Sequence, residues 1–252
     1  MMARTLRAEL SALLIAIRFC PGASRQSIKR LQRAAVPASK LACTSAADPQ
    51  RLGHKEEMKR RLGPSDILFP VPVALVASGS PEKPNLLAVA WIGMMGSDPP
   101  IIAISLKKNR YSLEIIRKAK EFTVNIPTAK HFRETDYCGL VSGRKQDKFK
   151  NCGFTTVPSS FVKAPLVEQC PFNLECRVVQ EIVLGDWVVI FGEILETHVD
   201  ADKFCPETGK IDVSKIDPLV YCATIREYWS LGTRLGFGFN AGKELVRKLK
   251  EE

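Results

Sequence analysis

The sequence predicts a mainly β protein, built as a closed or partly closed antiparallel barrel with a few short helices. Three observations support this fold class. Apolar and β-branched stretches recur from residue 71 to residue 231, and helical spacing is confined to short segments. One predicted strand also holds Gly192, which is typical of a bulge or a barrel bend. A chain with many strands and few helices favours a barrel over a doubly wound sheet.

The predicted elements follow one another without an internal repeat. Strands are expected at residues 71–79, 86–93, 101–107, 121–127, 170–184, 187–199 and 219–231. Helices are expected at residues 112–120, in short pieces within residues 129–152, and at residues 241–252. The last helix is amphipathic, with Leu245, Val246 and Leu249 on its apolar side.

The first 57 residues differ in composition from the rest. They are rich in Arg, Ser and Ala and poor in acids, which is typical of an organellar transit peptide. A second interpretation is that translation starts at Met58, where the domain pattern begins, and that the residues before it are upstream sequence. In either case we expect residues 1–57 to be a disordered leader and residues 58–252 to form one domain. We expect a cytoplasmic protein, or an organellar one if the leader is a genuine transit peptide.

The net charge of +10 is unevenly distributed. Residues 1–57 hold ten Lys or Arg and four acids, so they carry +6 and leave +4 for the remaining 195 residues. That excess suits small anionic ligands better than a nucleic acid, for which no motif is present. The apolar run at residues 10–17 is too short to span a bilayer. We therefore expect neither nucleic acid nor a membrane as a partner.

The chain lacks the usual signatures of metal binding and side-chain catalysis. Its eight cysteines form no CxxC pair, and its three histidines lie far apart. No GxSxG, HExxH, P-loop or GxGxxG motif is present in a suitable context. We expect no metal and reduced cysteines, with Cys138 the best placed for redox activity. If the protein is an enzyme, a cofactor is expected to carry the chemistry.

A basic corner lies between a predicted strand and the helix that follows it. Lys107 and Arg110 precede the helix start at Ser112, where free backbone N–H groups can bind a phosphate. Trp91 and Tyr111 can border a flat ring. The alternatives are a solvated turn in which Ser112 is only the N-cap, and aromatic side chains that belong to the core. The pattern leaves both interpretations open.

Five motifs occur in an order and at intervals that are similar to those of a known family. They are Asn85-x5-Trp91, Asp98-Pro-Pro-Ile-Ile-Ala-Ile-Ser-Leu106, Asn109-Arg-Tyr-Ser112, Glu121-Phe-Thr-Val-Asn-Ile-Pro127 and Asp136-Tyr-Cys-Gly-x2-Ser-Gly-Arg-x2-Asp-Lys-Phe149. Together they resemble the flavin reductase family with the FMN-binding split-barrel fold, and most of all its flavoredoxin-like branch. The resemblance extends over residues 58–252.

The resemblance implies a homodimer of split barrels, with FMN bound near the subunit interface and NAD(P)H as co-substrate. No side chain is expected to be catalytic, because the flavin N5 carries the chemistry. The residues that it assigns to the cofactor are Ala88, Val89, Ala90, Trp91, Ile92, Gly93, Lys107, Arg110, Tyr111, Ser112 and Asn125. Those that it assigns to the nicotinamide or acceptor side are Ser142, Gly143 and Arg144.

One stretch departs from the pattern of the family. Relatives often carry Thr or Ser on the strand that faces the flavin, whereas this chain has Ala88, Val89 and Ala90. Backbone N–H groups would have to replace the missing hydroxyl near the flavin N5.

The implied activity is that of an NAD(P)H-dependent flavin reductase. It transfers a hydride from NAD(P)H to flavin and passes electrons to free flavin, ferric complexes or a protein acceptor. The alternative is an FMN-binding electron carrier that a partner protein reduces. A third hypothesis, based on charge alone, is a module that binds anions or nucleic acid. A yellow protein bleached by NADH or NADPH fits the first, a yellow protein inert to both fits the second, and a colourless protein fits the third.

Overall fold

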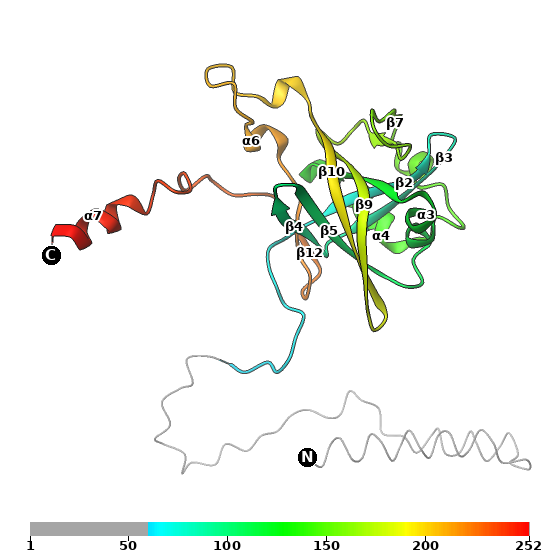
Figure 1. The fold of residues 1–252 in the computed structure, drawn as a ribbon, viewed down its shortest axis with the longest axis horizontal. Coiled ribbons are helices and arrows are strands. Elements are labelled where there is room, and N and C mark those ends of the chain that lie inside the picture. Colours follow the sequence, from blue (N-terminus) through cyan, green and yellow to red (C-terminus); the bar gives the residue numbers. More distant parts are fainter. Residues whose placement is uncertain (1–59, 252) are drawn as a thin grey trace, which may run out of the picture. The chain divides into compact units, whose positions relative to one another are not determined.

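The computed structural model describes residues 60–251, with side chains up to residue 247, so the predicted leader lies outside the described part. Seven antiparallel strands form its main sheet, in the order β3-β2-β6-β9-β10-β5-β4 (Figure 1). The strands are β2 (Ala74–Ser80), β3 (Lys83–Val89), β4 (Ile92–Ser97), β5 (Pro100–Lys107), β6 (Glu121–Ile126), β9 (Phe172–Leu184) and β10 (Trp187–Val199).

The two edge strands of this sheet are neighbours in the chain. Strand β3 forms one edge and β4 the other, and only Ala90 and Trp91 separate them. Two residues cannot span a flat sheet of seven strands, because adjacent strands lie about 4.8 Å apart. The sheet must therefore curl until its edges approach each other, which makes it a partly closed barrel. The predicted fold class is confirmed.

Small sheets and short helices complete the fold. Strands β1 (Val71–Pro72), β11 (Val220–Cys222) and β12 (Glu227–Trp229) form a second sheet, and β7 (Thr156–Val157) pairs with β8 (Leu166–Val167). The helices are α3 (Tyr111–Ala119), α4 (Phe132–Leu140), α5 (Lys148–Cys152), α6 (Val213–Ile216) and α7 (Lys243–Glu251), with 3-10 turns η2 (Ala129–His131) and η3 (Ala201–Lys203). Among residues 60–251 no helix has the length and apolar character needed to cross a membrane.

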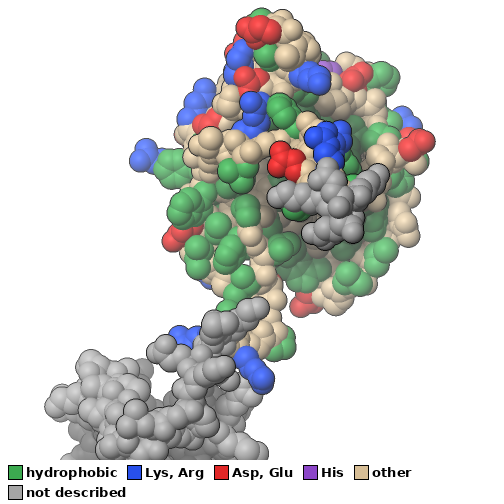
Figure 2. All heavy atoms as spheres, turned by 90° about the vertical axis from the view of Figure 1, so that its left-hand side faces the viewer, with side chains coloured by type: hydrophobic (Ala, Val, Ile, Leu, Met, Phe, Trp, Pro, Cys, Tyr) green, Lys and Arg blue, Asp and Glu red, His purple; other side chains and the backbone are tan. Residues whose placement is uncertain are grey.

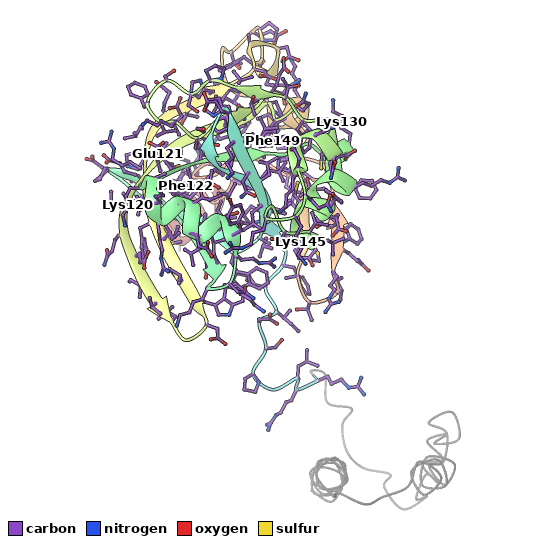
Figure 3. The ribbon with its side chains drawn as sticks, turned by 90° about the vertical axis from the view of Figure 1, so that its right-hand side faces the viewer. Lys120, Glu121, Phe122, Lys130, Lys145 and Phe149 are labelled. Carbon is purple, nitrogen blue, oxygen red and sulfur yellow. The ribbon has the colours of Figure 1, made fainter. Side chains whose placement is uncertain are left out.

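Strand β2 has both faces buried, which explains its nearly continuous apolar sequence. Successive side chains of a strand point to opposite faces. Ala74 and Val76 therefore join one buried cluster inside the barrel, together with Phe122 and helix α3, whereas Leu75 joins a second cluster with Phe149 of α5. Figure 3 shows Phe122 and Phe149 at these two separate places.

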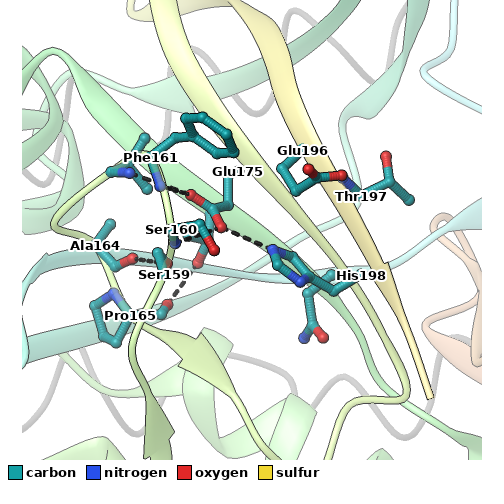
Figure 4. Close-up of polar contacts among 12 residues, drawn as sticks. Ser159, Ser160, Phe161, Ala164, Pro165, Glu175, Glu196, Thr197 and His198 are labelled. Atoms are coloured by element: carbon teal, nitrogen blue, oxygen red, sulfur yellow. Dashed lines mark hydrogen bonds and ion pairs between the residues drawn. The ribbon is translucent and has the colours of Figure 1, made fainter. Parts of the chain in front are cut away.

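Glu175 of β9 holds an adjacent loop against the sheet (Figure 4). Its buried carboxylate accepts backbone N–H bonds from Ser160, Phe161 and Val162 at 2.6–3.1 Å, and its Oε1 lies 2.7 Å from Nε2 of His198. Burial by itself raises the pKa of this carboxyl. The N–H donors and His198 outweigh burial, so the pKa of Glu175 is lowered from its ordinary value of 4.5.

Three strand predictions were wrong. Residues 71–79 are divided between β1 and β2, which belong to different sheets. Residues 86–93 do not form one strand, because the chain leaves β3 after Val89 and enters β4 at Ile92, on the opposite edge of the sheet. Residues 219–231 form the hairpin β11–β12 instead of a single strand, with Arg226 at a positive φ of 58° in the turn. Residues 86–93 and 219–231 both have the right residues for strands. However, β3 pairs with β2 and β4 pairs with β5, whereas β11 and β12 pair with each other.

The prediction for the longest strands was accurate. Strand β10 has the predicted bounds, and β9 begins two residues later than expected. The pairing of β10 with β9 shifts register between Phe191 and Gly192, which confirms the predicted bulge. A Cβ atom at position 192 would lie 2.7 Å from the ring of Phe122, so only glycine fits this bend.

Candidate functional site

Two adjoining pockets lie where β3 passes into β4 and where β5 passes into α3. We call the first the strand pocket. It has a volume of about 240 Å³ and is lined by residues 87–91, by Lys107 and Arg110, and by Gly139 and Leu140 of α4. The second, which we call the cationic pocket, has a volume of about 200 Å³ and includes Asn85, Arg110, Ser112, Gly143 and Lys148. Leu87 and Arg110 line both, so the two pockets are contiguous.

Aromatic rings form part of the wall of the strand pocket. The rings of Trp91 and Trp187 stack with their centroids 5.8 Å apart, and Nζ of Lys107 lies 5.4 Å from the Trp187 centroid. Tyr228 donates its hydroxyl to Oδ1 of Asp136 at 3.1 Å. Burial and the Asp136 carboxylate raise the pKa of Tyr228, so this hydroxyl stays protonated. The pocket therefore offers flat apolar surfaces to a ligand.

The cationic pocket contains a buried ammonium group. Lys148 is only 4% exposed, and its Nζ donates to the carbonyls of Leu86 and Cys138, each at 2.7 Å. Within residues 60–251 it forms no ion pair with a carboxylate. Burial, together with the positive charge of Arg110, lowers the pKa of Lys148 to about 8. An ammonium has three donors, so one remains for a ligand.

Asn85 leaves a polar atom without a partner in the same pocket. Its Nδ2 donates to Oγ of Ser112 at 2.7 Å and to Oγ of Ser78 at 3.4 Å. Its Oδ1 is buried and has no hydrogen-bond partner within the described residues. A Cβ atom at position 143 would collide with that oxygen, so a larger residue than Gly143 would displace the Asn85 side chain. An unpartnered polar atom in a pocket marks a place where a ligand can bind.

The start of α3 supplies further donors. The N-cap of this helix is Arg110, and its side chain does not cap the helix. The first backbone N–H groups of a helix have no intrahelical partner, and the helix dipole favours an anion near them. Of the two roles that the sequence left open for Ser112, that of N-cap is excluded, because Ser112 is buried within the first turn and accepts a hydrogen bond from Asn85. It lines the pocket all the same.

Most of the predicted site residues converge on these pockets. Ala88, Val89, Ala90, Trp91, Lys107 and Arg110 line the strand pocket. Arg110, Tyr111, Ser112, Ser142 and Gly143 line the cationic pocket.

Arg144 and two residues of β4 lie just outside the two pockets. The guanidinium of Arg144 stacks on the ring of Tyr111 at 4.7 Å and pairs with Glu114. Ile92 and Gly93 line a third hollow of about 320 Å³, which shares Ala90 and Trp91 with the strand pocket.

Asn125 was predicted beside the cofactor, and the structure places it elsewhere. It is fully buried in β6 and lines neither pocket. Its amide donates to the Leu75 carbonyl at 3.0 Å and accepts from the backbone of Val167 at 2.9 Å and from Asn173 at 2.8 Å. Every polar atom of this side chain has a protein partner, so Asn125 serves to join strands.

Sequence reasoning missed three residues that shape the site. Lys148 and Asn85 stand inside the quoted motifs, but periodicity does not show that either side chain is buried. Trp187 opens β10 and reaches Trp91 only because β10 pairs with β5. The position of Lys148 and Asn85 within the quoted motifs is the one signal that the sequence offered.

The comparisons with known proteins identify the family of the chain. The family model "Flavin reductase like domain" matches residues 67–230, well over half of the chain, so the chain belongs to the flavin reductase-like family and has its split-barrel fold.

Two solved flavoredoxins are similar to the chain over their whole length. The flavoredoxin of Desulfovibrio vulgaris (Miyazaki F) is 35% identical with a TM-score of 0.69, and the match covers 73% of this chain and 100% of that one. The flavoredoxin of Methanosarcina acetivorans is 32% identical with a TM-score of 0.68, with coverages of 76% and 100%. An uncharacterized protein of Archaeoglobus fulgidus is 35% identical over 150 residues, which are 59% of this chain and 82% of that protein.

Proposed function

We propose that the chain is an FMN-dependent oxidoreductase that uses NAD(P)H to reduce flavin. The cofactor would occupy both pockets, with its ring system in the strand pocket and its phosphate in the cationic pocket. The observation that carries the proposal is the buried ammonium of Lys148, which has a free donor and no carboxylate partner among the described residues. A buried charge of this kind is costly unless an opposite charge accompanies it, and a phosphate would supply one.

The residues fit the two ends of FMN. Arg110 lies between the pockets and can bind two phosphate oxygens. Lys148 and the N-terminus of α3 would supply the other donors. The main chain of residues 88–91 would border the ring system, since Ala88, Val89 and Ala90 offer no hydroxyl.

Lys107 has a different place in this proposal from the one the sequence suggested. It was predicted to hold the phosphate together with Arg110, but its Nζ lies above the Trp187 ring and the residue lines only the strand pocket. We therefore assign Lys107 to the ring end of the cofactor. A cation near a reduced flavin would stabilise the negative charge that the flavin acquires.

Bound FMN would supply the redox chemistry, accepting a hydride at N5 from NAD(P)H and delivering electrons to free flavin, a ferric complex or a protein acceptor. The protein would hold the ring system and limit access of water to it. The hollow beyond Trp91 is apolar and adjoins the strand pocket, so it can admit a second ring. Ser142, Gly143 and Arg144 remain assigned to the nicotinamide or acceptor side as a prediction.

A second candidate function is electron transfer without direct use of nicotinamides. The similarity to two flavoredoxins, at 35% and 32% identity over their whole length, favours it. In this case the protein would bind FMN in the same pockets but receive electrons from a partner protein.

One experiment separates these functions. The full chain is purified, its visible spectrum is recorded before and after addition of FMN, and NADH or NADPH is then added without oxygen. Flavin absorbance that bleaches within seconds supports the reductase, whereas stable absorbance that only a reduced partner protein bleaches supports the carrier. If the protein binds no FMN at micromolar concentrations, both functions are excluded.

We also propose that the protein is a homodimer, as its family resemblance implies. Figure 2 shows apolar side chains gathered on the face that carries β4. Met94 and Met95 on this strand are more than half exposed, and an apolar hollow of about 650 Å³ lies beside them, lined in part by Pro100, Phe172 and Ile194. Contiguous exposed apolar surface of this kind is typical of an interface.

A further inference from the structure

Cys138 and Cys152 lie side by side, close to residues that line the two pockets. Cys138 belongs to α4 and is fully buried, whereas Cys152 ends α5 and is partly exposed. Their Sγ atoms are 3.8 Å apart. Of the six cysteines in the described part of the chain, no other two are in hydrogen-bonding contact.

We propose that Cys138 and Cys152 are a redox-active dithiol, which a hydroperoxide converts into a disulfide that joins α4 to α5. A sulfur–sulfur bond is about 2.05 Å long. The two thiols are already in contact, so a small movement of two short helices is enough to form it. The inference does not depend on the proposed cofactor, because both thiols belong to the folded chain itself.

The reaction balances with hydrogen peroxide as the oxidant. The thiolate of Cys152 attacks one peroxide oxygen, the O–O bond breaks, and a sulfenic acid and one water are formed. The sulfur of Cys138 then attacks the sulfur of Cys152 and displaces the hydroxyl group as a second water. The two thiols lose two protons and two electrons in all, and the peroxide takes them up to become two waters.

The surroundings of the pair decide which thiol reacts first. Cys152 is the more accessible, and its Sγ donates to the Glu134 carbonyl at 3.7 Å. Burial raises the pKa of both thiols, while the ammonium of Lys148 opposes this rise. The thiolate is the reactive form, so we expect slow oxidation that accelerates as the pH rises.

The disulfide would connect the walls of both pockets. The carbonyl of Cys138 accepts a hydrogen bond from Lys148, which lines the cationic pocket. Gly139 and Leu140, which follow Cys138 in the chain, line the strand pocket. Oxidation would therefore restrain the elements that form the site, through a bond that thiol reductants reverse.

Peptide mapping of the full chain tests the proposal. The protein is treated with hydrogen peroxide, remaining thiols are alkylated, and trypsin is added without reductant. We expect the peptides 134–144 and 151–163 to be joined, with a mass lower than the sum of the two by two hydrogen atoms, and to separate after reduction.

Two variants control for other thiols. The joined peptide should be absent from Cys152→Ser and unchanged in Cys205→Ser, in which a partly exposed cysteine far along the chain is replaced. Recovery of both wild-type peptides as alkylated thiols, or of Cys152 as a sulfinic acid without the joined peptide, would overturn the proposal. So would pairing of Cys138 with any other cysteine. The wild-type map decides the question even if a variant fails to fold.

Discussion

Lys148 shows how much a single buried residue can reveal about function. Two of its three donors are used by main-chain carbonyls of β3 and α4, so the side chain joins two elements and still faces the cationic pocket. These two hydrogen bonds account for the position of the side chain, but a buried cation without a counter-ion still costs free energy. We therefore infer that the positive charge of Lys148 serves to bind an anionic ligand.

Replacing Lys148 by Met tests this interpretation. The variant keeps the volume of the side chain and removes the charge, and a hydrogen bond to a charged group contributes about 1.5–3 kcal/mol. We expect the dissociation constant of FMN to rise about 10- to 100-fold. The affinity for riboflavin, which lacks the phosphate, should change little.

Lys108→Met is the matched control, because Lys108 is exposed and lines neither pocket. Equal loss of FMN and riboflavin affinity in Lys148→Met would show that the residue only supports the fold. A thermal unfolding curve of each variant separates that outcome from loss of structure.

The affinity for FMN should depend on pH through the same residue. Burial, followed by the charge of Arg110, lowers the pKa of Lys148 to about 8, while the sulfurs of Cys138 and Cys152 act in the opposite direction. A bound phosphate favours the protonated ammonium and raises this pKa. Affinity should therefore be greatest below pH 8 and fall as the pH rises above it. Titrations between pH 7 and pH 9.5 would show this, and a flat profile for wild type would contradict it.

The lowered pKa of Glu175 predicts how the stability of the protein changes in acid. Its pKa is lowered by the N–H donors of the loop and by His198, despite burial. The carboxylate therefore contributes stability above its ordinary pKa of 4.5, and this contribution is lost as the pH falls through the lower pKa of the folded state.

Glu175→Gln should lower the free energy of unfolding at pH 7 by about 1–3 kcal/mol, since an amide cannot accept all the donors. Urea unfolding at pH 7 and at pH 3.5 checks this, and the difference between variant and wild type should shrink at the lower pH. Glu196→Gln is the control, because Glu196 is exposed and accepts only from the neighbouring Thr197 N–H. If the free energies of unfolding of Glu175→Gln and wild type differ equally at both pH values, the ionised carboxylate of Glu175 is not the source of the stability.

Among the elements, β10 contains a glycine bulge that both the local sequence and the tertiary packing require. Its bulge at Gly192 brings the backbone against Phe122 of β6, in the interior of the barrel. The sequence indicated the bulge, because glycine is unusual inside a strand of β-formers. It did not indicate that the ring of Phe122 packs against this bend.

Gly192→Ala should lower the free energy of unfolding by about 1–3 kcal/mol through overpacking. The added methyl would lie 2.7 Å from Cζ of Phe122 and 3.2 Å from Cβ of Cys176. Chemical denaturation measures the loss. Gly232→Ala provides the control, since no atom lies within 4 Å of a Cβ placed there. Similar effects of the two substitutions would contradict the packing argument.

The connection between β3 and β4 shows where reasoning from sequence fails. Residues 86–93 read as one apolar strand, yet the chain leaves one edge of the sheet and enters the other at Ala90 and Trp91. The backbone N–H of Ser105 bonds to the Trp91 carbonyl at 2.9 Å, which holds the turn. That partner is distant in sequence, and local propensity carries no information about it.

At the scale of the whole molecule, the exposed apolar side chains of β4 predict that two copies of the chain form a dimer. The double variant Met94→Asp with Met95→Asp should convert a dimer into a monomer, because charges at the centre of an apolar interface are strongly unfavourable. Analytical ultracentrifugation measures the change. Val213→Asp alters another half-exposed apolar residue, on α6, and should leave the dimer intact.

A monomeric wild-type protein at micromolar concentrations would exclude the homodimer itself. A double variant that stays dimeric would show that the interface lies on another face.

The sequence by itself determined the mainly β fold, the bulge, the basic corner before α3 and the family, because these depend on local residue patterns and on motifs in a fixed order. Only the tertiary structure decided that Asn125 joins strands, that Lys107 lies over the Trp187 ring, and that Lys148 is buried in the wall of the cationic pocket. The hydrogen bond from Lys148 to Leu86 joins residues 62 positions apart. Burial of a charge and pairing of strands depend on which distant segments meet when the barrel closes, and that is a property of the whole chain.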